Sequence, residues 1–402
     1  MNIVHFNQTD VIGGAAIAAY RLHQGLIAEG ISSRLLVANQ SLEDNKIATI
    51  KTFPRIENRL RYLNEALGLR HLNFISSFKI PQHSFYQQAD ILNFHNVHGG
   101  FFNYLSLPSL TQSKPCVWTL HDMWSFTGGC VYSYDCDRWK IGCGKCPYPD
   151  AIVGRDATHW EWKLKDWVYS RSNLTIISPS LWLTQQAKQS ILNKFDIHHI
   201  PHGINTNAYL PLETDNCRDI LGIPRHKKVL MFGSQNLKDP RKGSDLLLKA
   251  LELLPKSLHS ELMLLTVGSG SENILNDLGF PTLSLGYISS DRLKSIVYSA
   301  ADVFILPTRA DNLPLVLQES LACGTPMVSF DVGGVSDLVR PYITGYLAQP
   351  ENPTDLCTGI LQILEDKEQH SKLRQQCREI ALAEYNLDLQ AKRYIELYKS
   401  IM

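Results

Sequence analysis

The sequence has no excess of charge of either sign, because Lys plus Arg and Asp plus Glu each number 39 among its 402 residues. Without a net field the chain has no general attraction for nucleic acid, so no nucleic-acid partner is expected and any basic function must be local. The sequence also lacks any run approaching the roughly 20 apolar residues of a membrane-spanning helix. Its first residues, MNIVHFN, lack the basic start and long apolar run of a signal peptide and predict a strand. We therefore expect a cytoplasmic protein.

The nine cysteines are odd in number, and in a cytoplasmic protein we expect them to be mostly reduced thiols. Four of them fall within seventeen residues in the pattern C-x5-C-x6-C-x2-C: Cys130, Cys136, Cys143 and Cys146. Four thiols this close indicate a tetrahedral structural zinc site, although the spacing is not that of a standard zinc finger, and free thiols or a disulfide are the open alternatives. Such a site would hold a loop in place and would take no part in catalysis. The D-x-D sequence formed by Asp135 and Asp137 inside this cluster is interpreted as coincidence.

A chain of 402 residues exceeds a comfortable single core and should form two domains of about 180 to 200 residues each. Short apolar runs alternate with helical patterns: IVHF, RLLVAN, ILNFHN, CVWTL and LTIISP in the first half, and KVLMFG, ELMLLTVG, TLSLGY, VFILP and PMVSF in the second. This alternation predicts an α/β fold with two Rossmann-like domains, each a parallel sheet wound on both faces. The boundary is expected within residues 201–211, where Pro, Gly and Asn break the periodicity. We assign residues 1–205 to the first domain and 206–382 to the second.

Two carboxylates, Asp311 and Glu319, lie eight positions apart around a predicted helix start in DNLPLVLQE. Pro314 is expected as the first helical residue, because its missing N–H costs nothing there. The loop from Asp311 through Asn312 and Leu313 would then present free N–H groups and a positive dipole end to an anion such as a diphosphate. The two carboxylates would lie about 10 Å apart, so each could hold one ring of a nucleotide sugar. Alternatively, Asp311 merely caps the helix and Glu319 is a solvated helix residue.

This segment, with SLACGTPMVSF after it, resembles the E-x7-E signature of retaining glycosyltransferases of family 4, with Asp311 in place of the first Glu. The similarity extends over essentially the whole chain. It implies the GT-B fold, in which two Rossmann-like domains face a central cleft and a last helix, here residues 383–402, crosses back to the first domain. It also implies that Asp311 orients the transferred sugar and that Glu319 holds the ribose.

In the first half, Gly13 and Gly14 form a strand-to-helix turn that lets a ligand approach the backbone closely. The turn is not G-x-G-x-x-G, so it does not indicate dinucleotide binding, and a simple tight turn is the alternative. His121 directly follows the apolar run CVWTL and matches the active-site His of the resembling family, which implies a contact to the sugar. His95 is a similar strand-end histidine and a candidate for the acceptor side. A lone histidine in such a place is more often a packed polar residue.

In the second half, Arg241 and Lys242 precede a helix that opens near Gly243, where they could neutralise a diphosphate leaving group. The resemblance carries Lys242 onto the phosphate-binding Lys of the family. That family usually has an Arg directly after the strand-end glycine, here Gly233, where this chain has Ser234. Arg241 or Lys238 is expected to replace that Arg.

Two weaker signals complete the donor side. Gly268 begins a second strand-to-helix glycine turn in VGSGSE, which extends to Ser271 and Glu272. The segment containing Tyr287 and Ile288 resembles the part of the family's fold that meets the nucleobase through its backbone.

The stretch of residues 54–80 is basic and amphipathic, with arginines among Ile, Leu and Tyr. It could rest on a membrane that carries a lipid-linked acceptor, or it is an ordinary surface helix. A peripheral position at the inner face of a membrane is thus compatible with the expected cytoplasmic location.

The sequence therefore predicts a retaining hexosyltransferase that uses a nucleoside diphosphate sugar, with UDP-glucose expected on family frequency, and a glycan or lipid-linked glycan acceptor. No cofactor or metal should be needed for catalysis. Lys242 and Arg241 would stabilise the leaving diphosphate, and His121 would orient the sugar. A nucleotide-sugar 2-epimerase on the same fold and a catalytically silent nucleotide-binding scaffold are the alternatives.

Overall fold

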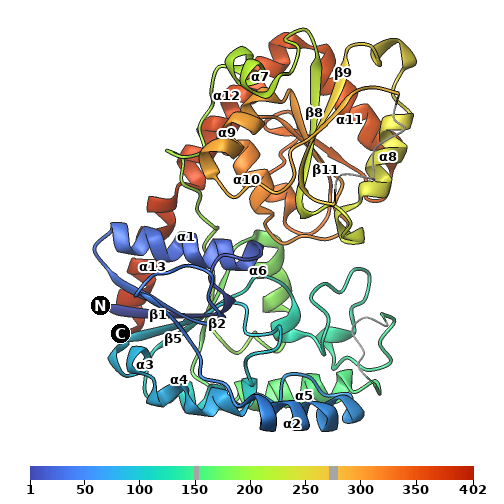
Figure 1. Cartoon of the computed structure of the whole chain (residues 1–402). Coiled ribbons are helices and arrows are strands. Elements are labelled where there is room, and N and C mark those ends of the chain that lie inside the picture. Colours follow the sequence, from blue (N-terminus) through green and yellow to red (C-terminus); the bar gives the residue numbers. More distant parts are fainter. Residues whose placement is uncertain (149–153, 271–278) are drawn as a thin grey trace. The chain divides into compact units, whose positions relative to one another are not determined.

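The computed structural model describes residues 1–148, 154–270 and 279–402 (Figure 1). They divide into two compact units. Unit 1 comprises Met1–Gly203 and Asp388–Met402, and unit 2 comprises Ile204–Leu387. The chain thus leaves unit 1 within the stretch where Pro, Gly and Asn interrupt the periodicity, and it returns at the start of the last helix.

Unit 1 is built on a seven-stranded parallel sheet with the order β3-β2-β1-β4-β5-β6-β7. Its strands are β1 Asn2–Thr9, β2 Ser32–Asn39, β3 Ile47–Thr49, β4 Ile91–Phe94, β5 Cys116–Thr119, β6 Thr175–Ser178 and β7 Ile197–His199. The sequence predicts five of these strands. It misses β3 and β7 because each has only three residues, too few for a clear apolar pattern.

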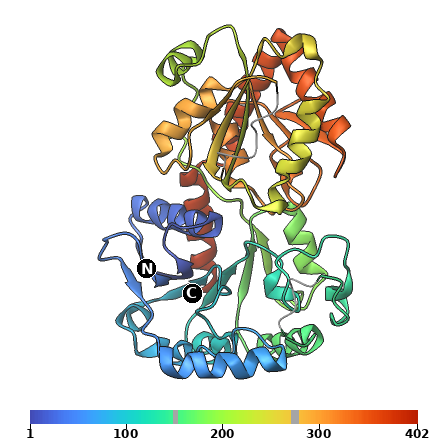
Figure 2. The same ribbon diagram turned by 45° about the vertical axis from the view of Figure 1, so that its right-hand side comes forward.

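Helices cover both faces of the unit 1 sheet, as Figures 1 and 2 show. They are α1 Gly14–Ala28, α2 Pro54–Leu67, α3 Ser84–Gln88, α4 Leu107–Thr111, α5 Thr158–Tyr169, α6 Leu181–Lys188 and α13 Leu387–Ile401. Both faces of β1 carry apolar side chains, so both faces need to be covered. Ile3 packs in a core with Leu22 of α1, whereas Val4 and Phe6 point into a separate core.

The C-terminal helix α13 is part of the unit 1 core. Its Tyr394 and Tyr398 are fully buried among apolar residues of β1, β4 and β5. Their hydroxyl groups bond into the sheet, Tyr398 OH accepting from Asn93 Nδ2 at 2.9 Å and Tyr394 OH lying 3.0 Å from Thr119 Oγ1. Because buried hydroxyl groups need partners, these two bonds fix the helix on this sheet.

Unit 2 is built on a six-stranded parallel sheet with the order β10-β9-β8-β11-β12-β13. Its strands are β8 Lys228–Asn236, β9 Leu262–Ser269, β10 Thr282–Ser284, β11 Val303–Leu306, β12 Met327–Phe330 and β13 Gly345–Ala348. Its helices are α7 Thr214–Leu221, α8 Ser244–Glu252, α9 Asp291–Ala300, α10 Leu315–Ala322, α11 Pro353–Glu365 and α12 Lys367–Glu384. The sequence predicts every strand here except the four-residue edge strand β13.

Alternation along β8 again separates two cores. Val229 and Met231 pack with residues of α9 and α10, whereas Leu230 and Phe232 pack with residues of α8 and α11. Both units therefore have the predicted α/β architecture of a parallel sheet wound on both faces. Among the described residues, no helix combines the length and apolar character needed to cross a membrane.

Candidate active site

Three residues that the sequence assigns to catalysis meet in one network beyond the end of β11 in unit 2. Asp311 Oδ2 lies 2.6 Å from Lys242 Nζ, which donates to it. Asp311 Oδ1 accepts a bond of 2.9 Å from Arg241 Nη1. A third donor, Thr308 Oγ1, bonds Asp311 Oδ2 at 3.0 Å. Asp311 is buried, so a carboxylate and two cations form one partly desolvated cluster.

A glycine on each side lets the backbone of this cluster pack closely. Gly243 has φ of +71°, and a Cβ there would lie 1.9 Å from Pro307 O. Gly333 has φ of +57°, and a Cβ there would lie 2.0 Å from Asp311 O. Gly334 N then donates to Asp311 O at 3.1 Å. Any side chain at either glycine would therefore push the turn carrying Lys242, or the chain at Asp311, out of place.

The electrostatics of the cluster favour an ionised Asp311. Burial by itself would raise the pKa of Asp311, but Lys242 and Arg241 outweigh that effect and hold the pKa below its usual value. The carboxylate consequently neutralises much of the charge of two side chains that are suited to bind phosphate. A diphosphate that bound here would find Lys242 and Arg241 already positioned, but it would have to compete with Asp311 for them.

The start of α10 differs by one residue from the prediction. Pro314 is the N-cap residue, with φ of −66° and ψ of 121°, and the helix begins at Leu315. Asp311 is therefore too far from the helix to cap it, and its carboxylate turns to Lys242 and Arg241. Asn312 and Leu313 are both buried, and Leu313 packs in the core of unit 2.

Glu319 is buried on α10 and does not belong to the solvated face that the alternative interpretation required. Its Oε1 lies 3.5 Å from Lys294 Nζ, and its Oε2 accepts a 3.3 Å bond from Tyr298 OH. Lys294 and Tyr298 are four residues apart on α9, which puts both on one helix face. These partners were not predicted from the sequence, although the K-x3-Y spacing in DRLKSIVY places a lysine and a tyrosine on one helix face.

The glycines of β8 and β9 serve the packing of the protein's own chain. Gly268 has φ of +135°, and a Cβ there would lie 1.9 Å from Ser234 O. Gly233 lies between the neighbouring strands, where a Cβ would approach Val267 O at 3.4 Å. The close backbone approach expected at Gly268 is thus made by Ser234. The remainder of that predicted turn, Ser271 and Glu272, lies outside the described residues.

The other residues expected on the donor side lie in separate loops of unit 2. Lys238 follows β8 and its side chain is exposed. Tyr287 is exposed, with 54% of its surface accessible, whereas the neighbouring Ile288 is buried in the core. The structure therefore joins Arg241, and not Lys238, to the Asp311 cluster.

The glycine turn of unit 1 lies between β1 and α1. Gly13 is the N-cap residue of α1 with φ of 98°, a conformation that favours glycine. A Cβ at Gly14 would meet nothing within 4 Å. Gly13 is therefore needed for the backbone geometry of the turn, whereas Gly14 faces open space.

His121 follows β5 and ends a line of three histidines. Its Nε2 lies 3.1 Å from His95 Nδ1, and His95 Nε2 lies 2.9 Å from His5 Nδ1. The ring of His202 stacks on His121 with a centroid separation of 5.1 Å. Burial lowers the pKa of His121 to about 4, with Asp122 opposing the shift. His121 is therefore neutral at pH 7.

The structure corrects the expected role of His95. This residue is buried, and both of its ring nitrogens face other histidines. No ring nitrogen is left for an acceptor sugar, so His95 is a partner of His121. His5 and His202 were missed because their proximity to His121 depends on where β1 and β7 lie in the sheet, which the local sequence does not show.

Asp122 is fixed beside His121. Its Oδ2 accepts from His98 Nε2 at 2.8 Å and its Oδ1 from Trp124 N at 2.8 Å. Burial opposes ionisation of Asp122, but His98 and the Trp124 N–H hold its pKa below the usual value. The strand end is thus held by side chains from two loops.

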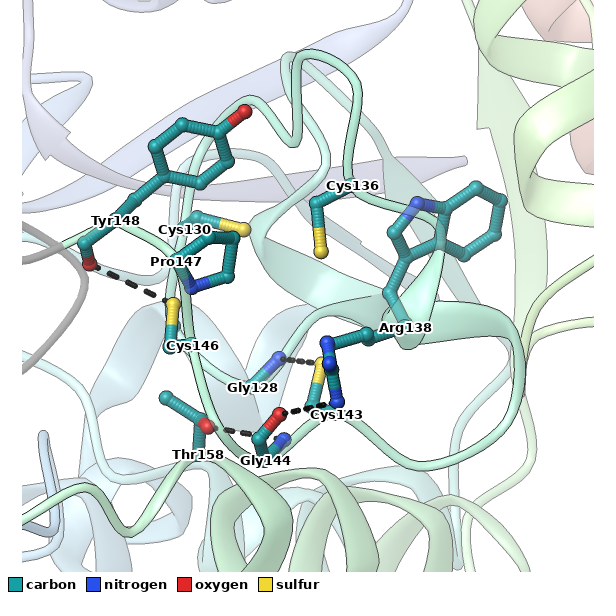
Figure 3. Close-up of a pocket in the computed structure, with 12 residues that line it drawn as sticks. Gly128, Cys130, Cys136, Arg138, Cys143, Gly144, Cys146, Pro147, Tyr148 and Thr158 are labelled. Atoms are coloured by element: carbon teal, nitrogen blue, oxygen red, sulfur yellow. Dashed lines mark hydrogen bonds between the residues drawn. The ribbon is translucent and has the colours of Figure 1, made fainter.

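The four clustered cysteines line a single hollow in unit 1 (Figure 3). All four are free thiols. Within the described part of the chain, no three side chains of His, Cys, Asp or Glu are gathered closely enough to hold a metal ion. Asp135 of the D-x-D sequence accepts a hydrogen bond from Tyr148 OH.

Two family models match the chain, and the boundary between them lies close to the boundary between the two units. Residues 12–208 match the model Glycosyltransferase Family 4, and residues 214–381 match the model Glycosyl transferases group 1. WcaC of Escherichia coli strain K12, which is assigned to colanic acid biosynthesis as a glycosyl transferase, is 28% identical over 359 residues. That alignment covers 82% of this chain and 83% of WcaC, whereas several other relatives are matched over about half of their own length.

Two solved structures resemble the whole chain. Sucrose-phosphate synthase from Thermosynechococcus elongatus aligns with a TM-score of 0.71 at 20% identity, covering 99% of this chain and 98% of that chain. Anabaena Alr3699/HepE, solved in complex with UDP and glucose, aligns with a TM-score of 0.71 at 16% identity and covers 100% of both chains. At these identities the likeness establishes a shared fold.

Proposed function

The chain belongs to the glycosyltransferases that these two family models describe and has their GT-B fold, and from that membership we propose that it transfers a hexose from a nucleoside diphosphate sugar to a glycan or lipid-linked glycan. UDP-glucose is the first donor to test, and the proposed stereochemical outcome is retention. The observation that carries the proposal is the buried cluster of Asp311, Lys242 and Arg241 in unit 2. It presents two cations where a diphosphate leaving group would need them.

The chemical role of Lys242 and Arg241 follows from the charge that develops during transfer. As the glycosidic bond breaks, the diphosphate gains negative charge, and cations held in a partly desolvated site stabilise that charge without reorganising. Both side chains are already anchored, Lys242 by Asp311 and Arg241 by Asp311 and Ala310 O. Because these charges come from side chains, the proposed reaction needs no divalent cation.

The two carboxylates have separate roles in this proposal. Asp311 orients the transferred sugar while it positions Lys242. Glu319 binds the ribose hydroxyl groups, and the contacts with Lys294 and Tyr298 support this role because they hold the buried carboxylate in one orientation. The backbone around Asn312 and Leu313 would bind the phosphates, and the backbone around Tyr287 and Ile288 would meet the base.

His121 is proposed to orient the sugar as a neutral hydrogen-bonding group. Its low pKa makes it a weak base, and the bond with His95 constrains both its tautomer and its ring orientation. This fits a retaining reaction with front-face attack, in which the leaving diphosphate helps to take the acceptor proton and no protein base is required.

A screen of nucleotides tests the donor assignment first. UDP, GDP, ADP and their sugars would each be added to the full chain in a thermal-shift measurement, where a ligand at 100 times its Kd stabilises by about 2.7 kcal/mol. The matched donor and a glycan acceptor would then be followed by NMR, where retention gives a product with the donor's anomeric configuration. If no nucleotide sugar binds or reacts, the proposed function is wrong.

The same experiment separates the two alternatives. A nucleotide-sugar 2-epimerase would isomerise the free donor without an acceptor. A binding scaffold would be stabilised by nucleotide but would neither hydrolyse nor transfer the sugar.

Helix α2 supports a further proposal of peripheral membrane contact. Its apolar side chains Ile56, Tyr62, Leu63 and Leu67 are each at least half exposed, and Arg55, Arg59 and Arg61 lie on the same helix. Exposed apolar residues beside arginines are suited to an anionic interface. The protein should float with vesicles that contain anionic lipid. If a variant with both Leu63→Glu and Leu67→Glu floats equally well, α2 does not bind the membrane.

A further inference from the structure

Among the described residues of unit 1, the longest stretch without an α-helix or a strand lies between the end of β5 and the start of α5. Within this connection only short 3-10 turns occur among the described residues, at Trp124–Phe126 and Arg138–Lys140. Long connections without secondary structure usually carry a function or need an additional staple. The four clustered cysteines all lie on this connection.

We propose that Cys130, Cys136, Cys143 and Cys146 bind one zinc ion as four thiolates, and that this site holds the segment next to His121 in place. All four residues line one hollow, and Figure 3 shows their sulfur atoms facing the same space. Four thiolates around one ion are a common ligand set of structural zinc. The sulfur atoms do not yet meet coordination geometry, so binding has to draw them together.

The CGKC turn brings the two cysteines of the C-x2-C pair to the same hollow. Cys143 and Lys145 have φ of +51° and +49°, and Gly144 between them has φ of +87°. Left-handed conformations are uncommon for residues other than glycine, and they persist where the surroundings require them. Here they fold the chain tightly between the two cysteines of the C-x2-C pair, so that both line the hollow.

A backbone donor already contacts one of the sulfurs. Gly128 N donates to Cys143 Sγ at 3.2 Å. Gly128 is itself fixed against α5, because a Cβ there would lie 2.2 Å from Thr158 O. Hydrogen bonds of this kind stabilise thiolate ligands and orient them around a metal.

The surroundings also supply positive charge, which the site needs because four thiolates and one Zn²⁺ carry a net charge of −2. Lys165 of α5 is fully buried, with Nζ donating to Trp124 O at 2.6 Å and Thr127 O at 2.9 Å. Its charge acts on both Cys130 and Cys143. Arg138 lines the hollow itself. A buried lysine is costly without a nearby negative partner, and zinc thiolates would supply one in addition to Glu161.

The other uses of clustered thiols fit less well. All four cysteines of the cluster are only partly exposed, which argues against an open site for a reactive thiol. The nine cysteines are all free. Zinc would bind the deprotonated thiols and release their protons to solvent.

The site is connected directly to the strand end that bears His121. Thr127 Oγ1 donates to Cys130 O at 2.6 Å, and Met123 N donates to Val131 O at 2.9 Å. Met123 is two residues from His121. Fixing Cys130 therefore fixes the backbone on which His121 and Asp122 are placed.

Metal analysis of the full chain, purified without chelators, tests the site without any activity measurement. We expect about one zinc per chain and release of that zinc by a mercurial that blocks thiols. Reconstitution with cobalt(II) should give the thiolate charge-transfer bands and strong visible absorption of a tetrahedral site. Protein that contains no zinc and gives no such spectrum, or that has an internal disulfide among these four cysteines by mass, would overturn the proposal.

Matched cysteine variants locate the ligands. Cys136→Ser and Cys146→Ser should each lower zinc content at least severalfold, whereas Cys357→Ser, at a buried free cysteine of α11 in unit 2, should leave it unchanged. Zinc content that survives both cluster substitutions would place the metal elsewhere. If the cluster variants fail to fold, the cobalt spectrum of the unsubstituted chain still decides the question.

The consequence for His121 rests on the proposed function. Stripping zinc should lower the thermal transition followed by tryptophan fluorescence, because all seven tryptophans belong to unit 1. It should lower hexose transfer at least tenfold while nucleotide affinity in unit 2 stays within twofold. Stoichiometric zinc in a protein that transfers no sugar would refute the proposed function alone, and full transfer without zinc would refute the positioning role.

Discussion

Lys242 Nζ lies 2.6 Å from Asp311 Oδ2, although the two residues are 69 positions apart in the sequence. The lysine follows β8 and the aspartate follows β11, which are neighbours in the unit 2 sheet. In parallel sheets the carboxyl ends of neighbouring strands meet at one edge, where α/β folds bind ligands. The pair is therefore a direct product of the strand order.

This pairing bears on how the proposed donor binds. Breaking one partner of a buried ion pair generally costs about 3 to 5 kcal/mol, because the other charge is left without compensation. Lys242 can leave Asp311 for a phosphate only if Asp311 keeps Arg241 and Thr308, which the structure provides. Lys242 can therefore move from Asp311 to a phosphate while the charge of Asp311 stays compensated by Arg241.

The first prediction is that Lys242→Ala lowers the transfer rate by roughly 100-fold, because charge develops on the diphosphate only as the glycosidic bond breaks. The measurement is kcat with matched donor and acceptor. Lys249→Ala, at an exposed lysine of α8, is the control and should keep its rate. Wild-type turnover in Lys242→Ala would remove the residue from catalysis.

The second prediction is that Glu319→Ala weakens binding of the free nucleotide as well as of the donor, because the proposed ribose contact is common to both. Losing charge-assisted hydrogen bonds should lower the binding free energy by about 1.5 to 3 kcal/mol. Calorimetric titration with the nucleotide provides the measurement, with Glu252→Ala on α8 as an exposed control. Unchanged affinity in Glu319→Ala would exclude the ribose role.

These residues also show what the sequence could and could not predict. Most of the strands, the doubly wound sheets and the candidate residues Asp311, Lys242 and Arg241 follow from apolar runs, glycine turns and motif spacing. Their mutual contacts do not, because they depend on the close approaches at Gly243 and Gly333 to segments far away in the sequence.

The errors have equally specific causes. Pro314 fits both the N-cap and the first helical position locally, so the helix start was placed one residue early. His95 has the same strand-end context as His121. Only the contact with His5, on the neighbouring strand β1, shows that His95 is buried and bonded on both sides. The partners of Glu319 were missed because Lys294 and Tyr298 lie on a different helix.

The third prediction is that His121→Ala loses transfer by roughly 100-fold yet keeps its nucleotide affinity within about twofold, because the proposed nucleotide contacts all belong to unit 2. Turnover and nucleotide titration are measured on the same preparation. His226→Ala, at an exposed histidine, is the control. Full activity in His121→Ala would overturn its role with the sugar, whereas loss of nucleotide binding would indicate a general structural defect.

The fourth prediction is that transfer survives EDTA, since Lys242 and Arg241 are proposed to provide the charge that a divalent cation supplies in other enzymes. Zinc held by four thiolates should be released too slowly to affect a short assay. Turnover is compared with and without EDTA, with zinc content measured after each assay. Recovery of a chelated enzyme by manganese or magnesium alone would contradict metal-independent catalysis.

The last prediction concerns pH, because unit 1 contains several histidines that are neutral when folded. Burial lowers the pKa of His23 and His121 to about 4 and that of His71 to about 3, and it also lowers those of His5, His95 and His202. Each folded pKa lies below the unfolded value of 6.5. Between pH 6.5 and 4 the unfolded chain therefore binds more protons than the folded chain, so the stability of unit 1 must fall as the pH falls.

For a single histidine whose pKa drops from 6.5 to about 4, the loss at pH 5 relative to pH 8 is on the order of 2 kcal/mol. Tryptophan fluorescence reports unit 1 selectively, since residues 204–387 contain no tryptophan. We expect its thermal midpoint to fall by several degrees from pH 7 to pH 5, since 1 kcal/mol corresponds to roughly 2 to 4 °C in a domain of this size. His226→Gln, at an exposed position, should not change that dependence, whereas His23→Gln should reduce it. A midpoint that stays constant over this range would show that these histidines are not buried as neutral groups.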